Sequence, residues 1–244
     1  MRFLIIVVCL LSEKYLIHNF HQYRQTWLNI YFDKLKQYVP SSILFQSPIN
    51  PFLITVLSLL SAVLLITLLT KNGLLFILYF FFEAVIFYFC LGEHNLFYTN
   101  TEQPIKLNAK QYIQAINHEY FAVILWFFFF GPMGAILYKV TSYFAKLQPH
   151  EQQIQFILNI LDWVPVRLTA LFFLLVGQFQ PGFSHFLNQL RAKPEDNAKL
   201  LNDSAKFALG HDKEHDPISL ETLFTHSCLL LTFILAILMI GSIL

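Results

Sequence analysis

The 244-residue sequence is strongly apolar: 56% of its residues are hydrophobic and only 13% are charged. Soluble domains carry about 25% charged residues, so the composition excludes an ordinary cytosolic enzyme and a disordered regulator. The net charge of +1 also excludes the basic patch on which nucleic-acid binding depends. The sequence therefore predicts an integral membrane protein, surrounded by the lipid bilayer.

The first apolar segment is short. Residues 3–11 are uninterrupted by charge, and the segment extends over residues 3–17 only by including Glu13 and Lys14. A signal-peptide core has this form, but no A-x-A-like cleavage site follows it. We expect an uncleaved anchor, and the sequence leaves open whether it spans the bilayer.

Four further segments are long and apolar enough to cross a bilayer core of about 30 Å, which takes roughly 20 residues of helix. They cover about residues 52–70, 74–92, 120–144 and 220–244. Residues 71–73 (Lys-Asn-Gly) predict a turn between the first two spans. Asp216-Pro217 predicts the start of the last helix, with Asp216 as its N-cap.

Residues 152–179 are long enough to span but carry polar or helix-breaking residues near their middle, namely Asn159, Asp162, Pro165 and Arg167. One interpretation is a single kinked helix across the bilayer. The other is a helix broken at Asp162, with an amphipathic surface helix before it and a shorter apolar helix after it. We favour the broken helix, because Pro165 would then lie in a first turn, where its missing N–H does no harm.

The fold class that follows is all-α: one polytopic transmembrane helical domain, with four spans, a short N-terminal segment and one broken or amphipathic helix. Polar loops are expected at residues 18–51, 93–119 and 180–219. If every apolar segment spans, these loops share one side and hold most of the Lys and Arg residues, which the positive-inside rule places in the cytoplasm. If residues 152–179 do not cross, the last loop changes sides.

Glu83 lies near the middle of the span at 74–92, where a charge is costly and is expected to face the other helices. A proton or ion pathway and a neutral interhelical hydrogen bond are both open. We favour the hydrogen bond, because no second acidic residue lies deep within the four spans.

A cluster of small residues with a proline, Gly131-Pro132-Met133-Gly134, interrupts the span at 120–144. Small residues allow close helix approach, and the proline should kink the helix. Transporters carry such breaks in paired halves, whereas this chain has one. We therefore expect a kink and a packing role.

Motifs for chemistry are few. His211 and His215 have a spacing that could hold zinc on a helix, but a solvated acidic linker before the last span accounts for them equally well. No phosphate-binding or nucleophile motif occurs. We therefore expect no catalytic residue, no metal and no cofactor.

Asp162 and Arg167 share one apolar stretch, and we expect them to neutralise each other as a buried ion pair. Arg167 could instead contact an anionic headgroup or a phosphate ligand. Trp163 between them suits a membrane interface.

This stretch carries a family resemblance. Leu-Asp-Trp-Val-Pro-Val-Arg-Leu at residues 161–168, followed by Ala170 and Gly177, resembles the signature of the AmpE family of bacterial inner-membrane proteins. That family is similar to the CobD/CbiB adenosylcobinamide-phosphate synthases, whose version is N-W-I-P-A-R-L-T-A-L. A second match is Gly131-Pro132-x-Gly134-Ala135-x-x-Tyr138-Lys139, with Lys139 where both families have Arg. Glu13, after the first apolar run, is a weaker match.

The AmpE resemblance implies a regulatory or signalling protein, multi-pass in the bacterial inner membrane, that acts in ampicillin resistance through β-lactamase induction and cell-wall recycling. It implies a cell-wall-recycling amidase or another membrane protein as partner. The CobD/CbiB resemblance implies an ATP-dependent amide-forming enzyme of cobalamin biosynthesis. A small transporter is a third interpretation.

Departures from the synthase pattern favour the regulator. The synthases' E-N-x-x-D-G stretch is replaced by Asn-His-Glu-Tyr-Phe at residues 117–121, and Asp162 stands where they have Asn. We expect a non-enzymatic protein whose ligand-binding or conformational centre contains Asp162, Trp163, Pro165, Arg167, Gly131, Pro132, Gly134, Tyr138 and Lys139.

Overall fold

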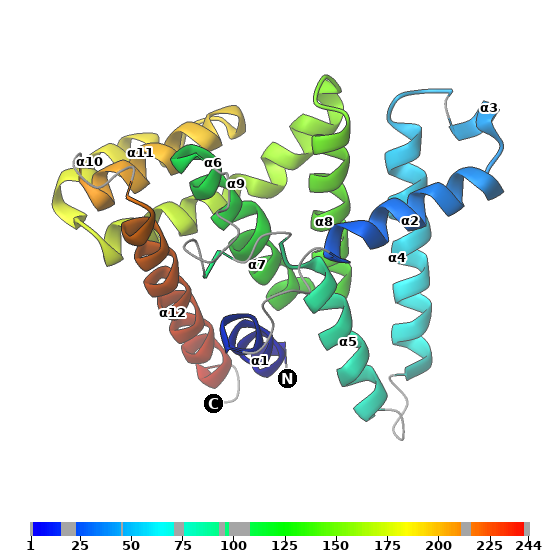
Figure 1. Cartoon of the computed structure of the whole chain (residues 1–244), viewed down its shortest axis with the longest axis horizontal. Helices are drawn as coiled ribbons and strands as arrows, with labels where there is room; N and C mark the ends of the chain where they lie inside the picture. Colours follow the sequence, from blue (N-terminus) through cyan, green and yellow to red (C-terminus); the bar gives the residue numbers. More distant parts are fainter. Residues whose placement is uncertain are drawn as a thin grey trace.

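The computed structural model describes residues 2–15, 23–44, 46–70, 76–92, 96–97, 108–210 and 216–241, and most of these residues lie in helices (Figure 1). The elements in chain order are α1 (Arg2–Tyr15), α2 (Tyr23–Tyr38), α3 (Ser41–Leu44), α4 (Asn50–Thr70), α5 (Phe76–Cys90), α6 (Ala109–Ala115), the π-helical turn η3 (Ile116–Phe121), α7 (Ala122–Phe130), α8 (Pro132–Leu147), α9 (Gln152–Val176), α10 (Phe179–Gln189), the 3₁₀ turn η4 (Pro194–Asp196), α11 (Asn197–Leu209) and α12 (Pro217–Gly241). The predicted all-α fold class is confirmed.

Four helices are long and apolar enough to cross a membrane: α4, the continuous rod α6–η3–α7 (Ala109–Phe130), α9 and α12. Helix α5 is apolar but has 15 residues. Helices α4 and α12 coincide with the predicted spans at 52–70 and 220–244. The expected N-cap is also present, since the Asp216 carboxylate accepts hydrogen bonds from the backbone N–H groups of Ile218 (3.3 Å) and Ser219 (3.2 Å).

The structure corrects the predicted span at 120–144. Gly131 has φ +69° and ends α7, and Pro132 opens a new helix, α8, that runs back beside α7 (Figure 1). A Cβ added at Gly134 would lie 2.4 Å from the Trp126 carbonyl oxygen, so the two helices meet closely at the reversal. The sequence predicted a kink because Pro132 usually bends a helix, but a left-handed glycine directly before it reverses the chain instead.

The broken helix expected at 152–179 is also wrong. Helix α9 runs without interruption from Gln152 to Val176, with Pro165 inside it. The polar residues that suggested a break have partners on other elements: Asp162 bonds to side chains of η3 and α8, and Arg167 bonds to the chain around α10. Tertiary contacts of this kind stabilise a helix that its own sequence would interrupt.

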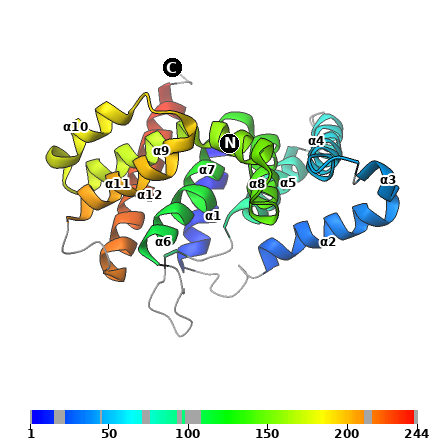
Figure 2. The ribbon, with the colours of Figure 1, turned by 90° about the horizontal axis from the view of Figure 1, so that it is seen from above.

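Where the structure describes them, the predicted polar loops are largely helical. Residues 18–51 contain α2 and α3, residues 93–119 contain α6, and residues 180–219 contain α10 and α11. Figure 2 shows α2 running along one side of the pair formed by α4 and α8. The expected turn at 71–73 and the histidines His211 and His215 lie outside the described residues.

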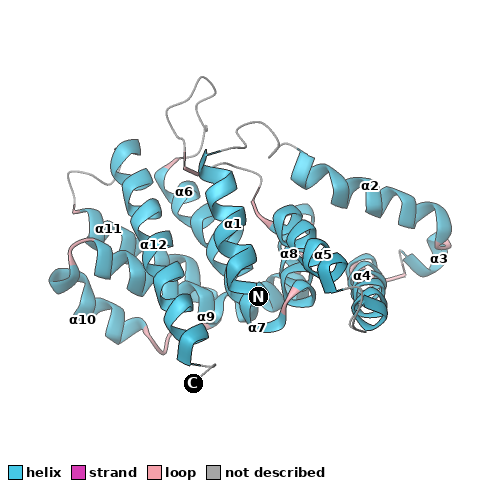
Figure 3. Cartoon of the chain, turned by 90° about the horizontal axis from the view of Figure 1, so that it is seen from below, coloured by secondary structure: helices cyan, strands magenta, loops and turns pink. Residues whose placement is uncertain are grey.

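The N-terminal segment predicted at 3–17 forms α1, which lies between α12 and α5 (Figure 3) and also contacts α7. A buried aromatic cluster of Tyr120, Phe224 and Phe97 joins η3 to α12, with ring centroids 4.7 to 6.0 Å apart. Large apolar side chains are exposed on α4, α5 and α12, as expected where helices face lipid.

Candidate functional site

The π-helical turn η3 directs four consecutive polar residues toward three other helices. Asn117 and His118 reach Asp162 of α9, Glu119 reaches Lys146 of α8, and Tyr120 reaches Glu13 of α1. A π-turn widens the helix by one residue and occurs frequently at functional sites. In this chain it brings polar groups from separate helices to one place in an apolar protein.

Asp162 is the centre of this polar cluster and is 2% exposed. Its Oδ1 accepts hydrogen bonds from Tyr138 Oη (2.7 Å) and Asn117 Nδ2 (3.1 Å), and its Oδ2 lies 3.2 Å from His118 Nδ1. Thr169 donates to Asn117 Oδ1 at 3.1 Å and holds that amide in its orientation. The carboxylate therefore joins η3, α8 and α9.

These contacts fix the tautomer of His118. Tyr138 has one hydroxyl proton and donates it to Asp162, so the 2.9 Å contact between Tyr138 Oη and His118 Nδ1 requires the imidazole to donate. With its proton on Nδ1, a neutral His118 has Nε2 as its hydrogen-bond acceptor. The His118 side chain is 30% exposed, so solvent can reach the ring.

A shallow pocket opens beside this cluster. Its empty space of about 290 Å³ includes the open solvent at its mouth, and its enclosed part has room for about one water molecule. Its lining comes from α2, η3 and α8 and consists of Leu28, His118, Glu119, Lys139, Ser142, Tyr143 and Lys146. Lys146 Nζ and Glu119 Oε1 are 4.0 Å apart. Burial and then the charge of Asp33 raise the pKa of Tyr143, so its phenol remains a neutral hydroxyl near pH 7.

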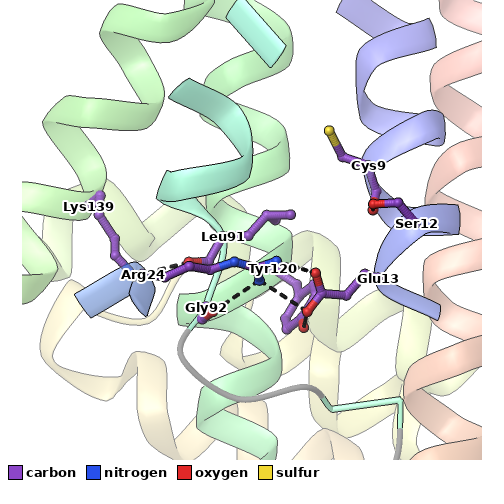
Figure 4. A network of polar contacts seen from close by, with 8 residues as sticks. All are labelled: Cys9, Ser12, Glu13, Arg24, Leu91, Gly92, Tyr120 and Lys139. Carbon is purple, nitrogen blue, oxygen red and sulfur yellow. Dashed lines mark hydrogen bonds and ion pairs between the residues drawn. The ribbon is translucent and has the colours of Figure 1, made fainter. Parts of the chain in front are cut away.

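A second buried network lies beside the pocket (Figure 4). Arg24 of α2 forms an ion pair with Glu13 of α1 through its two terminal guanidinium nitrogens, and both side chains are inaccessible to solvent. Arg24 also donates to the Gly92 carbonyl oxygen (3.2 Å), and its guanidinium lies 4.1 Å from the ring centroid of Tyr88. Although burial opposes the charge, the hydrogen bonds and charge of Glu13 raise the pKa of Arg24.

The C-terminal end of α5 is capped by two cations. Lys139 of α8 donates to the Leu91 carbonyl oxygen at 3.2 Å, next to the Gly92 carbonyl that Arg24 contacts. Cations stabilise the carbonyl end of a helix. Lys139 and Arg24 thereby fix the end of α5 against α8 and α2.

Arg167 does not pair with Asp162, which corrects the predicted ion pair. Five residues apart on an α-helix, the two side chains point about 140° away from each other. Arg167 instead donates to the carbonyl oxygens of Leu190 (2.7 Å) and Ala192 (2.7 Å), just beyond α10, and stacks on Trp163 at 4.0 Å. It fixes α10 to α9 rather than facing the pocket.

The glycine and proline residues of the predicted centre lie elsewhere. Gly131, Pro132 and Gly134 form the reversal between α7 and α8, about 9 Å along α8 from Tyr138. Arg2 covers this reversal by donating to the carbonyl oxygens of Phe128 (3.3 Å) and Phe129 (3.2 Å).

Glu83 is bound at the same end of the molecule as the reversal. Its carboxylate lies 3.7 Å from Arg2 Nε and accepts a hydrogen bond from Tyr79 Oη at 2.7 Å. The side chain of Glu83 is 3% exposed. It links α5 to α1 by an ion pair, and its hydrogen bond lies within α5, so the arrangement differs from the neutral interhelical hydrogen bond that we favoured from the sequence.

Of the predicted centre, the structure therefore brings together Asp162, Tyr138 and Lys139. Trp163 and Arg167 lie with α10, and the Pro165 carbonyl oxygen lies 2.9 Å from Thr169 Oγ1 within α9. Glu13 belongs to the network with Arg24.

Sequence reasoning missed Asn117, His118, Glu119 and Lys146. The one available signal was the run of polar residues directly before the apolar part of the predicted span. Within the described residues no group of three His, Cys, Asp or Glu side chains could hold a metal ion.

Fold and site together define the class of protein: a helical membrane protein with a charged pocket and buried polar networks between its helices. The model of one protein family, described as regulatory signalling modulator protein AmpE, matches residues 94–244. Since the match covers more than half of the chain, the chain belongs to the AmpE family. Comparison with curated proteins and with solved structures gave no match.

Proposed function

We propose that this protein is a multi-pass component of the bacterial inner membrane that regulates the response to β-lactams such as ampicillin, through β-lactamase induction linked to cell-wall recycling. The observation that supports this most is the placement of the family match. Residues 94–244 include η3, α8 and α9, which supply every polar side chain of the Asp162 cluster and all of the pocket lining except Leu28.

The geometry supports a signalling role because the polar contacts join helices to one another. Asp162 connects three elements, and Glu119 and Lys146 connect η3 to α8. A ligand that binds His118 or Lys146 competes with their contacts to Asp162 and Glu119, and so changes the contacts between η3, α8 and α9. Such a change between two arrangements is how a binding event at one site reaches another surface. We propose that a cell-wall-recycling amidase or another membrane protein receives that change.

One observation favours a second candidate, the amide-forming enzyme of the CobD/CbiB type. An imidazole held by a buried carboxylate at Nδ1, with Nε2 as its acceptor, is an arrangement that general bases use. Such a base could deprotonate an amine donor. The regulator remains our conclusion, because the pairs His118–Asp162 and Glu119–Lys146 each connect two different helical elements.

The test is β-lactamase induction in the host bacterium. A clean deletion strain is complemented with the wild-type chain, with His118→Gln, or with Lys199→Gln, which removes an exposed charge on α11 as a matched control. β-Lactamase activity is measured with a chromogenic cephalosporin before and after a sub-inhibitory inducing β-lactam, and membrane levels of each variant are equalised by immunoblot.

We expect the deletion to change induced activity severalfold, the wild type and Lys199→Gln to restore it, and His118→Gln to fail. Unchanged induction in the deletion strain would remove the regulatory proposal. Amide formation by purified protein with ATP, magnesium, a corrinoid acid and an aminoalcohol would establish the enzyme instead.

A further inference from the structure

The charged pocket lies level with the beginning of a candidate membrane span. The ring of Phe144 on α8 contacts Phe52, in the first turn of α4, at 5.8 Å, and Phe32 of α2 at 5.2 Å. Lys146 follows two residues later, about 3 Å farther along the helix. If α4 crosses the bilayer, Lys146 therefore lies at the height of the lipid headgroups.

The charges at the pocket are unbalanced toward positive. Two lysines, Lys139 and Lys146, line it with one carboxylate, Glu119. His118 also lines it, with the Asp162 carboxylate 3.2 Å from its Nδ1. The side chains differ in access: Lys146 is 50% exposed and His118 is 30% exposed, whereas Glu119 is 6% exposed. An incoming group thus meets two nitrogen-bearing side chains before the carboxylate. Hydroxyl groups of Ser142 and Tyr143 complete the lining.

We propose that this pocket binds a phosphate-type oxyanion, contacted directly by Lys146 and by His118 in its protonated form, in which Nε2 also carries a hydrogen. Charge-assisted hydrogen bonds to phosphate oxygens are the strong interactions that such groups offer. The phosphate of a phospholipid headgroup and that of a soluble phosphate ester share this chemistry, and the position of Lys146 at headgroup height is compatible with either source. The inference rests on the proposed role of the pocket as the place where a signal is received.

Glu119 is an internal competitor for Lys146. Its carboxylate lies 4.0 Å from Lys146 Nζ, and it cannot withdraw toward α5, because Gly92 packs so closely that an added Cβ there would lie 2.2 Å from Glu119 Cβ. A bound oxyanion must therefore replace Glu119 as the partner of Lys146 while the Glu119 carboxylate stays nearby. This predicts opposite effects for the two residues: loss of Lys146 weakens binding and loss of the Glu119 charge strengthens it.

The experiment uses the purified full chain in neutral detergent and follows the thermal unfolding midpoint, which rises when a ligand binds the folded state. The lipid probe is a short-chain phosphatidylglycerol, with the diacylglycerol of the same chains as its phosphate-free control. The soluble probe is inorganic phosphate, with chloride at equal ionic strength as its control. The variants are Lys146→Gln, Lys146→Arg, Glu119→Gln and the matched surface control Lys199→Gln.

We expect one or both phosphate probes to raise the midpoint of the wild type while their controls do not. Lys146→Gln should raise the apparent dissociation constant about tenfold, which is the effect of one lost hydrogen bond to a charged group. Lys146→Arg should retain binding, Glu119→Gln should tighten it, and Lys199→Gln should leave it unchanged. A response to the lipid probe alone identifies a headgroup, and a response to inorganic phosphate alone identifies a soluble ligand.

The inference is overturned if neither probe shifts the wild-type midpoint, if Glu119→Gln binds no more tightly than the wild type, or if Lys199→Gln weakens binding as much as Lys146→Gln. Lys146→Arg and Glu119→Gln keep the test decisive should Lys146→Gln fail to fold. Because the assay contains no signalling component, binding here with unchanged β-lactamase induction in cells would refute the proposed function and leave the oxyanion site standing.

Discussion

The buried ion pair between Glu13 and Arg24 gives the sharpest stability prediction. It connects α1 to α2, and Arg24 also bonds to the Gly92 carbonyl at the end of α5. The perturbation is Arg24→Met, which keeps an unbranched apolar stem and removes the guanidinium with its charge. The carboxylate of Glu13 then remains buried and loses its ion pair with Arg24, while Tyr120 Oη stays 3.4 Å from it.

The magnitude follows from the burial of both partners. Removing one member of a buried ion pair costs about 3–5 kcal/mol, because the remaining charge is left uncompensated in a medium of low polarity. For a chain of this size one kcal/mol corresponds to about 2–4 °C in the unfolding midpoint. Arg24→Met should therefore lower the midpoint by roughly 10 °C.

The double variant Glu13→Leu with Arg24→Met should recover most of this loss, because replacing a whole buried pair by apolar residues is often close to neutral. The matched measurement is thermal unfolding of both single variants and the double variant in one detergent, followed by circular dichroism at a helical wavelength. The reasoning is refuted if Arg24→Met alone stays within about 1 kcal/mol of the wild type, or if the two single losses simply add in the double variant.

Two further predictions concern the reversal between α7 and α8 and its surroundings, and the same unfolding assay checks both. Gly131→Ala should lower the free energy of unfolding by about 1–2 kcal/mol, since its φ of +69° is strained for any residue with a Cβ and the added atom would lie 2.9 Å from the Arg2 guanidinium. The control is Gly241→Ala, which should be neutral because nothing lies within 4 Å of the added Cβ. Arg2→Gln should cost about 1–3 kcal/mol by leaving the Glu83 carboxylate buried without its ion pair. Adding Glu83→Gln should return part of that stability, and an equal loss in the single and double variants would contradict the pairing.

Much of the fold could be predicted from local sequence. The lengths of the apolar runs place α4 and α12, and Asp216 with Pro217 marks the start of α12, because hydrophobic length and helix capping depend on neighbouring residues alone. The same local rules failed at Pro132 and Pro165. Each proline has the same chemistry, yet one lies at a reversal and the other inside an unbroken helix.

The candidate site was predicted in part. Tyr138 and Asp162 were identified by a family resemblance, and the structure places Tyr138 Oη 2.7 Å from Asp162 Oδ1. His118 and Glu119 were interpreted as a departure from the pattern of a related enzyme family, whereas the structure places both at the pocket. Residue type alone could not reveal this, because the π-helical turn that aims them at different helices has no signature in the sequence.

The scarcity of charge in the sequence by itself determined that this is a membrane protein and that each intramembrane charge must have a partner. Only the tertiary structure decided which partner each one has. Asp162 and Arg167 are close in sequence and opposite in charge, but helix rotation points them to different neighbours, one to His118 and the other to the carbonyls beyond α10. A buried charge requires compensation from some group within reach, and the packing of the helices selects that group.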